Sequence, residues 1–297
     1  MATTKNILPF LSSRKQGFTL IELSIVLVVI GLIIGGVLVG TDLVRAAGVR
    51  ATIAQIEKFN TAVNTFNSKY GALPGDLNGL VATQFGFTPR GTHACQGNGD
   101  GVIQGCANAL YTTASGTSET AGETVMFWVD LTTANGMNIN LIDGGFNTAQ
   151  ETVPAGNTGY SGTFTDLWLP AAKLGQGNSI YVYSQNGINY YSMSRIANVL
   201  SASNFISYPA LTVRQAYNID QKIDDGFPQT GNVTTLYLYG SLTWEGGDTG
   251  STDTTTATPP SAATCYDDGG STGARRTYSL SQNNGNGVNC ALSFKFQ

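Results

Sequence analysis

Residues Arg14–Gly40 read RKQGFTLIELSIVLVVIGLIIGGVLVG, and this stretch decides the fold. Two cations and a glycine precede a run that is almost wholly apolar, apart from one carboxylate, Glu22. No residue from Leu23 to Gly40 carries a charge. At about 1.5 Å per residue, a helix of this length nearly crosses a hydrocarbon core of about 30 Å. We therefore expect the stretch to span a membrane.

This segment does not have the layout of a cleaved secretory signal, whose apolar stretch is shorter and ends at a small-residue cleavage site. Lys5, Arg14 and Lys15 precede the apolar run, which favours a cytoplasmic N-terminus. Arg45 and Arg50 on the other side weaken that asymmetry. We expect a single-pass membrane protein with its N-terminus in the cytoplasm and its larger part on the other side of the membrane.

The helix is predicted to continue beyond the apolar run without a break. A single apolar stripe follows, with spacings of three and four residues, formed by Ile53, Ile56, Phe59, Val63, Phe66 and Tyr70. Gly71 is a plausible C-terminal cap, and Pro74 forbids continuation. One helix over residues 18–70 would thus have a membrane-spanning half (18–40) and an amphipathic half (41–70).

Composition excludes some classes of function. The 297-residue chain is 41% hydrophobic, only 11% charged and contains 37 glycines, which indicates a loop-rich β domain over residues 71–297. A formal charge of -4 argues against nucleic-acid binding, which depends on clustered Lys and Arg. The chain has one histidine and no phosphate loop, so we expect no enzyme and no cofactor.

Four glycines lie inside the apolar half, at Gly31, Gly35, Gly36 and Gly40. They form two G-x-x-x-G spacings, which let helix backbones approach closely in lipid. The alternative is that small residues are simply common in membrane helices.

The pattern G-F-T-L-I-E with its apolar continuation resembles the prepilin-type signal of type IV pilins and type II secretion pseudopilins. The resemblance implies that a prepilin peptidase cuts between Gly17 and Phe18, releases residues 1–17 as a leader and methylates the Phe18 amine. It implies that Glu22, fifth in the mature chain, pairs with the N-terminus of a neighbouring subunit. The expected fold is α+β and pilin-like, with the long helix packed on a mainly antiparallel sheet.

The same resemblance implies a filament subunit of a type IV pilus or a secretion pseudopilus. Its partners would be the prepilin peptidase/methyltransferase, other pilin or pseudopilin subunits and an inner-membrane assembly platform, with no nucleic acid. Val39 stands where many major pilins carry proline. This departure leaves room for a minor or tip pilin that acts in adhesion or substrate binding.

Three further stretches resemble a less characterised group of prepilin-like proteins: YGALPGDLNG (70–79), GNGDGVIQG (97–105) and ETVMFWVDL (123–131). The second also imitates a calcium loop, with Asn98 and Asp100 as weak candidate ligands. Position 12 of an EF-hand loop falls on Ala107 instead of a bidentate Glu, so a Gly-rich turn is the preferred interpretation.

In the exported region, NSIYVYSQNGINYYSMS (178–194) predicts a hairpin turning at Asn186-Gly187. Asn232–Trp244 is predicted as one strand and NCALSFKF (289–296) as a half-buried terminal strand, with a low-complexity loop over 246–264 between them. The tyrosines of the hairpin could line a contact face, although cross-strand packing is the preferred interpretation; they are Tyr181, Tyr183, Tyr190 and Tyr191.

Thr212 and Gln215 have capping-box spacing and predict a short helix that ends before Gly226 and Pro228. Its predicted buried face comprises Ala216, Ile219 and Ile223, and its solvated acidic edge comprises Asp220, Asp224 and Asp225.

Four cysteines form two local pairs. An even number in an exported chain favours disulfides Cys95–Cys106 and Cys265–Cys290 over buried thiols.

Overall fold

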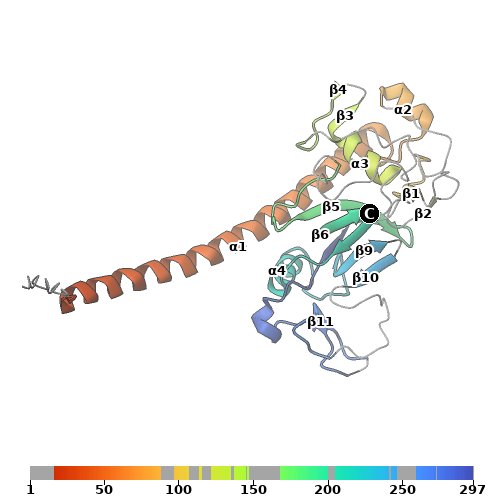
Figure 1. Cartoon of the computed structure of the whole chain (residues 1–297). Helices are drawn as coiled ribbons and strands as arrows, with labels where there is room; N and C mark the ends of the chain where they lie inside the picture. The colour runs from red at the N-terminus through yellow and green to blue at the C-terminus, as the bar shows by residue number, and fades with distance from the viewer. Residues whose placement is uncertain are drawn as a thin grey trace, which may run out of the picture. The chain divides into compact units, whose positions relative to one another are not determined.

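The computed structural model describes residues 17–87, 97–106, 114–115, 122–134, 137–144, 146, 168–199, 205–240, 242–245, 259–271 and 273–296. The chain forms two compact units, Met1–Val44 and Arg45–Gln297, each treated by itself below. The expected leader (1–17) lies outside the described residues except for Gly17. The fold is α+β: a long apolar N-terminal helix is followed by a curled antiparallel sheet domain (Figure 1).

Helix α1 runs from Leu20 to Tyr70, two residues later than expected at its start and as predicted at its end. Gly71 follows with φ +72°, a left-handed conformation that suits glycine, and its amide donates to the Asn67 carbonyl. The predicted apolar stripe of the second half is confirmed, since Ile56, Phe59, Val63 and Phe66 are buried in the core.

Three shorter helices lie in the described part of the second unit: α2 (Gly79–Phe85), α3 (Glu123–Thr132) and α4 (Val213–Ile223). Every residue of α3 is buried. The capping box of α4 is confirmed, because Thr212 and Gln215 cap each other reciprocally. Ala216 and Ile219 are buried as predicted, whereas Ile223 is exposed because the helix ends there.

The main sheet is antiparallel throughout and is built around the long strand β6 (Ile188–Val199). One edge of β6 pairs with β5 (Asn178–Gln185) over the whole length of β5. Its other edge is shared by β13 (Leu292–Lys295) and β7 (Phe205–Tyr208). The sheet is completed by β8 (Val233–Thr234), β9 (Leu236–Gly240) and β10 (Leu242–Glu245).

The remaining strands form short two-stranded ladders. They are β1 (Gly105–Cys106) with β2 (Ala114–Ser115), β3 (Thr133–Ala134) with β4 (Met137–Asn138), and β11 (Tyr266–Asp267) with β12 (Thr277–Tyr278). A 3-10 turn, η3, covers Gln282–Gly285.

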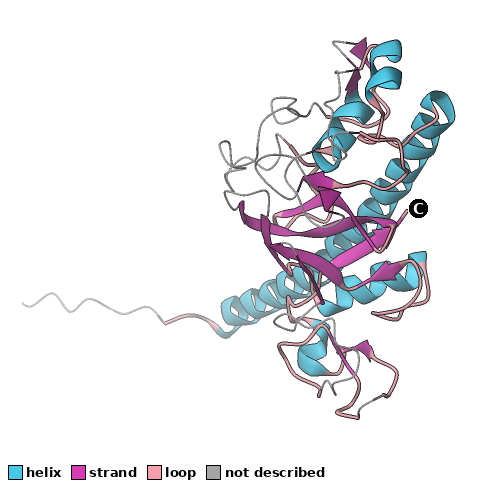
Figure 2. Cartoon of the chain, turned by 90° about the vertical axis from the view of Figure 1, so that its right-hand side faces the viewer, coloured by secondary structure: helices cyan, strands magenta, loops and turns pink. Residues whose placement is uncertain are grey.

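The second half of α1 lies across one face of the main sheet (Figure 2). Phe59 joins the two layers: its ring centroid is 5.1 Å from that of Trp128 on α3 and 5.9 Å from that of Tyr191 on β6. Edge-on aromatic contacts of this kind add roughly 0.5–1.5 kcal/mol each beyond the area they bury. The core of the second unit is therefore centred where helix, α3 and sheet meet.

The β5–β6 hairpin is confirmed, including its turn. Asn186 and Gly187 have φ values of 52° and 76°, the two left-handed residues that a type I′ turn requires. Tyr181, Tyr183 and Tyr191 are buried, and Tyr190 stacks on Tyr183 with ring centroids 5.3 Å apart. The tyrosines therefore pack across strands, and the alternative of a tyrosine contact face is wrong.

The prediction of one strand over Asn232–Trp244 is wrong. The segment forms β8, β9 and β10, and β9 pairs with β10 so that Tyr239 faces Leu242. Because Tyr239 is the register partner of Leu242, the chain reverses directly after Gly240. The terminal strand β13 exists as predicted, but it pairs on both sides, with β6 and β8, so Ser293 is buried as well as Leu292 and Phe294.

The disulfide between Cys265 and Cys290 is confirmed. It closes a segment that contains β11, β12 and η3 and returns the chain to the sheet beside α4. Cys95, and with it the proposed bond to Cys106, lies outside the described residues. The low-complexity loop is described only from Pro259 onward.

Candidate functional site

The first turn of α1 is closed by Thr19 and Glu22. The Thr19 hydroxyl accepts from the Glu22 amide at 3.3 Å, while a Glu22 carboxylate oxygen accepts from the Thr19 amide at 2.8 Å and its hydroxyl at 2.7 Å. This reciprocal pattern is a capping box, which satisfies amide groups that have no partner within the helix. Glu22 thus has a partner within its own chain, which the sequence analysis missed although T-L-I-E has capping-box spacing.

The apolar half of α1 buries none of its side chains within the chain. Its most apolar window has a mean hydropathy of 2.9 and no buried residue, so by length and composition it can cross a membrane. Gly31, Gly35, Gly36 and Gly40 also face open space, since a methyl group added to any of them would meet no other atom within 4 Å. The residues that the structure describes therefore supply no packing reason for these glycines.

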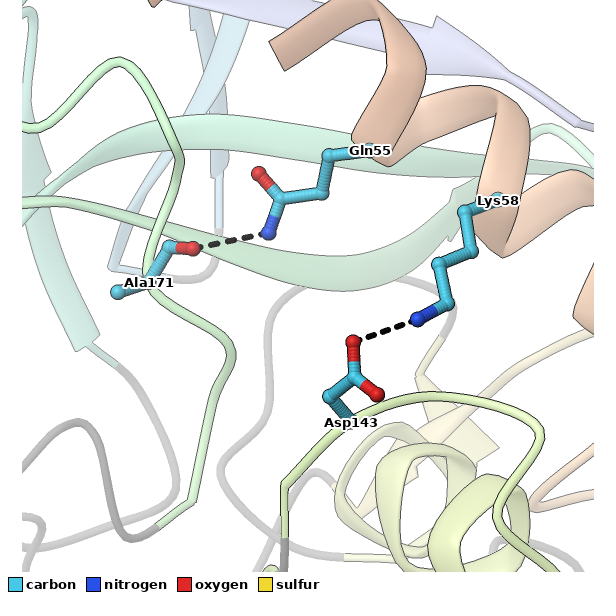
Figure 3. A network of polar contacts seen from close by, with 4 residues as sticks. All are labelled: Gln55, Lys58, Asp143 and Ala171. Carbon is cyan, nitrogen blue, oxygen red and sulfur yellow. Dashed lines mark hydrogen bonds and ion pairs between the residues drawn. The ribbon is translucent and has the colours of Figure 1, made fainter. Parts of the chain in front are cut away.

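Within the second unit, two polar side chains on the amphipathic half of α1 bind other segments of the unit (Figure 3). Gln55 donates to the Ala171 carbonyl at 2.9 Å and accepts from the Lys173 amide at 2.8 Å, so both ends of its amide bind one backbone segment. One turn further, Lys58 Nζ lies 2.5 Å from an Asp143 oxygen. This hydrogen bond and the lysine charge lower the pKa of Asp143.

The three stretches that resemble the less characterised prepilin-like proteins (70–79, 97–105 and 123–131) are joined by hydrogen bonds into one unit. Asp76 accepts from the amides of Gly99 (2.7 Å) and Gly101 (2.8 Å). Glu123 at the start of α3 accepts from the amides of Gly97 (3.0 Å) and Gln104 (2.7 Å). The loop 97–104 therefore wraps its backbone N–H groups around two carboxylates, an arrangement in which successive amides bind an anion.

Two further contacts complete this unit, which we call the carboxylate clasp (Asp76, Glu123 and the loop 97–104). Asp130 at the other end of α3 accepts from the Gly75 amide at 2.7 Å, so α3 is tied to the segment after α1. Asn189 accepts from Ile103 and donates to the Gly101 carbonyl, both at 2.8 Å, which ties the loop to the sheet. A methyl group on Gly75 would lie 2.3 Å from the Glu123 carbonyl oxygen, so only glycine fits there.

Burial dominates the electrostatics of the clasp. Asp76 and Glu123 are 1% and 0% exposed. Desolvation, with the neighbouring Asp76 charge, raises the pKa of Glu123 to about 9. Desolvation likewise raises the pKa of Asp76, although its hydrogen bonds to the loop act in the opposite direction. Burial thus disfavours the charged form of both acids, whereas the N–H donors of the loop favour it.

The weak calcium candidates, Asn98 and Asp100, belong to the clasp loop. Asp100 accepts from the Val102 amide at 2.8 Å and from the side chains of Asn98 (2.8 Å) and Gln104 (3.0 Å). N–H donors therefore face its carboxylate, as they face the carboxylates of Asp76 and Glu123. A calcium ion would have to displace them, because it needs six to eight oxygen ligands. Asn98 and Asp100 therefore brace the loop.

The prediction of a solvated acidic edge on α4 is wrong for Asp220. It is buried, its carboxylate accepts from the Tyr278 hydroxyl at 2.7 Å and from the Gly226 amide at 3.2 Å, and burial raises its pKa to about 7. Asp224 accepts from the amides of Asn232 and Val233. Asp225 is exposed, as predicted. The first two acids therefore hold β8 and β12 against α4.

Comparison with known proteins bears on the N-terminus. A family model, the prokaryotic N-terminal methylation motif, matches residues 12–38, which include Gly17, Phe18, Glu22 and three of the four apolar-half glycines. No curated protein and no solved structure matches the chain. The match and the long apolar helix define a protein with the prepilin-type cleavage and methylation signal of type IV pilins and pseudopilins. Such a signal indicates a pilin-type structural protein processed by prepilin peptidase.

Sequence reasoning missed the buried acids Asp76, Glu123 and Asp220. A signal for two of them was present: Glu123 opens the apolar run ETVMFWV, and Asp76 lies between Leu73 and Leu77, which are both buried. An acid surrounded by core residues must be paired or hydrogen-bonded.

Proposed function

We propose that the chain is a structural subunit of a type IV pilus-like or type II secretion pseudopilus filament. In this proposal residues 1–17 are removed, Phe18 becomes the methylated N-terminus, and the apolar half of α1 carries the subunit from the inner membrane into a helical bundle. The observation that carries it is the methylation motif at residues 12–38 directly preceding and entering an apolar helix.

The packing of α1 supports this role. Its apolar half exposes large side chains on all sides, including Leu20, Val28 and Leu32. A helix that is apolar all round must be buried, either in lipid or among other helices. Filament assembly would replace lipid contacts by contacts between copies, with close approach at the two G-x-x-x-G spacings of Gly31, Gly35, Gly36 and Gly40.

Glu22 would set the register of assembly by pairing with the Phe18 amine of a neighbouring copy. An acid within a membrane helix costs on the order of 2.5–3.5 kcal/mol at the centre on insertion scales and is usually functional. The capping box lowers this cost in the free subunit, because Thr19 already satisfies one carboxylate oxygen. The other oxygen remains for an intermolecular partner.

Intact-mass spectrometry and N-terminal sequencing of the membrane-extracted protein test the processing step. We expect a mature chain that begins with N-methylated Phe18 and a Gly17→Val variant that keeps residues 1–17. A mature N-terminus elsewhere would refute the assignment of the cleavage site. Deleting the gene and scoring piliation against release of exported proteins then separates pilus from pseudopilus.

A low-copy minor or tip subunit is the second candidate. Val39, in place of the proline of many major pilins, favours it, and so does an exported region of considerable size, residues 71–297. Quantitative mass spectrometry of purified filaments decides between the two. One or a few copies per filament would support the minor subunit, and thousands would support the main structural one.

A further inference from the structure

A cleft of about 370 Å³ lies between α4 and the disulfide-closed segment, and none of its lining residues belongs to the clasp. Its lining includes three aromatic rings and three hydrogen-bonding side chains: Tyr217, Phe227, Tyr278, Gln221, Asp225 and Thr277. Pockets that bind small molecules enclose roughly 300–1,000 Å³ and combine apolar or aromatic walls with a few polar groups. In size and composition this cleft is at the smaller end of that class.

The aromatic walls are held in fixed positions. The rings of Tyr217 and Tyr278 meet edge to face, with centroids 5.8 Å apart at 67°. The Tyr278 hydroxyl is anchored on buried Asp220, as described above. The disulfide-closed segment that carries Tyr278 is fixed to α4 by two hydrogen bonds from the Arg214 guanidinium to the Asn284 carbonyl, at 2.6 and 3.2 Å. A preformed cleft loses little entropy when a ligand binds.

The polar groups of the cleft can both accept and donate. Asp225 is oriented by the Phe227 amide at 2.9 Å and the Thr230 hydroxyl at 2.6 Å, which leaves lone pairs for further donors. In the part of the chain that the structure describes, the carboxamide of Gln221 and the hydroxyl of Thr277 make no hydrogen bond, and both residues are exposed. Three side chains of different hydrogen-bonding character therefore surround the aromatic walls.

The charges at the cleft disfavour an ionic ligand. The Arg275 guanidinium stacks on Phe227, with Cζ 3.1 Å from the ring centroid, and its charge acts on Asp225. The chain's own cation thus already occupies a face that a cationic ligand would use, and Asp225 repels an anion. A neutral ligand with many hydroxyl groups suits the cleft, because each hydroxyl can donate to the Asp225 carboxylate and exchange hydrogen bonds with Gln221 and Thr277.

We propose that this cleft binds a pyranose sugar. One face of a pyranose ring presents C–H groups of slight positive charge, which are attracted to the negative face of an aromatic ring. Its edge presents hydroxyl groups for Gln221, Asp225 and Thr277. The proposal goes beyond the filament role and stands independently of whether the chain assembles.

The test is saturation-transfer difference NMR on the full-length mature protein in a detergent without a sugar headgroup. The probes are glucose, galactose, mannose and N-acetylglucosamine, each at millimolar concentration. We expect transfer to the C–H protons on one face of at least one sugar. Tyr217→Ala should weaken binding roughly tenfold, which corresponds to about 1.4 kcal/mol, and Gln221→Ala should weaken it less.

The matched control is Tyr208→Ala. Tyr208 is an exposed tyrosine that also belongs to an edge-to-face pair, with Tyr239 at 5.8 Å, but it does not line the cleft and its loss should leave sugar binding unchanged. The exposed position of Gln221 makes its variant safe for folding, so the proposal does not depend on Tyr217 alone. Absence of transfer to all four sugars would overturn the proposal. Equal binding by wild type and both cleft variants, or binding of arginine amide in place of sugars, would also overturn it.

Discussion

A single oxygen of Glu22 accepts hydrogen bonds from both the amide and the hydroxyl of Thr19, so the acid that opens the apolar helix is also its cap. This dual role separates two functions that the residue could have. Glutamine caps a helix in the same way as glutamate, whereas it cannot form an ion pair.

We therefore expect Glu22→Gln to keep the helix start, membrane insertion and cleavage, and to lose assembly. The measurement is the amount of variant in sheared filaments relative to the amount in the membrane. Glu57→Gln is the matched control, since Glu57 is an exposed acid on the same helix outside its apolar half. Normal filament incorporation of Glu22→Gln would remove the proposed role in register.

Gly35 provides a second test of assembly that leaves the subunit intact. A methyl group there meets no other atom of the chain, and alanine favours a helix by about 1 kcal/mol over glycine. Gly35→Ala should therefore insert and fold as well as wild type but enter filaments less efficiently, and Gly35→Leu should be worse. Filament yield that does not depend on side-chain size at this position would contradict helix packing through Gly35.

Glu123 predicts a pH dependence of stability. Its pKa rises from 4.5 to about 9 on folding, so the folded state favours the protonated acid. The corresponding stability is fully present below pH about 4.5 and is lost as the pH rises toward 9. In Glu123→Gln this loss should be smaller, as measured by thermal midpoints between pH 5 and 9 in detergent. Glu57→Gln should follow the wild-type profile, and an unchanged profile in Glu123→Gln would contradict the buried state of this carboxyl.

Asp220 contributes over a lower pH range. Its pKa rises from 3.8 to about 7, so its contribution is present at low pH and disappears as the pH approaches 7. Asp220→Asn should reduce the loss of stability below pH 7. The loss between pH 7 and 9 should persist in this variant, because it comes from Glu123. Tyr278→Phe should cost about 1–3 kcal/mol, because a buried carboxylate oxygen loses its donor. A carboxyl titration by NMR at Asp220 near its ordinary value would contradict this assignment.

Gln55 and Lys58 lie one turn apart on α1 but should differ in importance. Gln55→Ala removes two hydrogen bonds to the 171–173 backbone and should cost about 1–2 kcal/mol. Lys58→Ala removes an exposed ion pair, whose contribution is small and is screened by salt, so we expect little change. Denaturant midpoints of the two variants provide the comparison. Equal destabilisation would contradict the prediction, because it would show that the Lys58–Asp143 ion pair contributes as much stability as the two Gln55 hydrogen bonds.

Much of this fold is local and therefore predictable from sequence. The end of α1 at Gly71, the Asn186-Gly187 turn and the Thr212–Gln215 capping box each depend on residues close together in the chain. Asp220 and the clasp depend on partners far away: Tyr278 is 58 positions from Asp220, and Gly101 is 25 positions from Asp76. No periodicity indicates such pairings. Gly240 ends β9 at a reversal that the alternating pattern of Asn232–Trp244 does not reveal.

In the proposed function the second unit is exported, and the place of β13 in the sheet then has a consequence for that export. Contacts between Ser192 on β6 and Leu292 on β13 join positions 100 residues apart, so in export from the N-terminus onward β6 would cross the membrane long before its neighbour does. During that interval one edge of β6 has unpaired backbone amide and carbonyl groups, which pair readily with strands of other chains. Slow formation of such distant contacts lengthens the interval. Periplasmic holding factors that shield nascent strands should therefore limit the yield of this protein more than its final stability does.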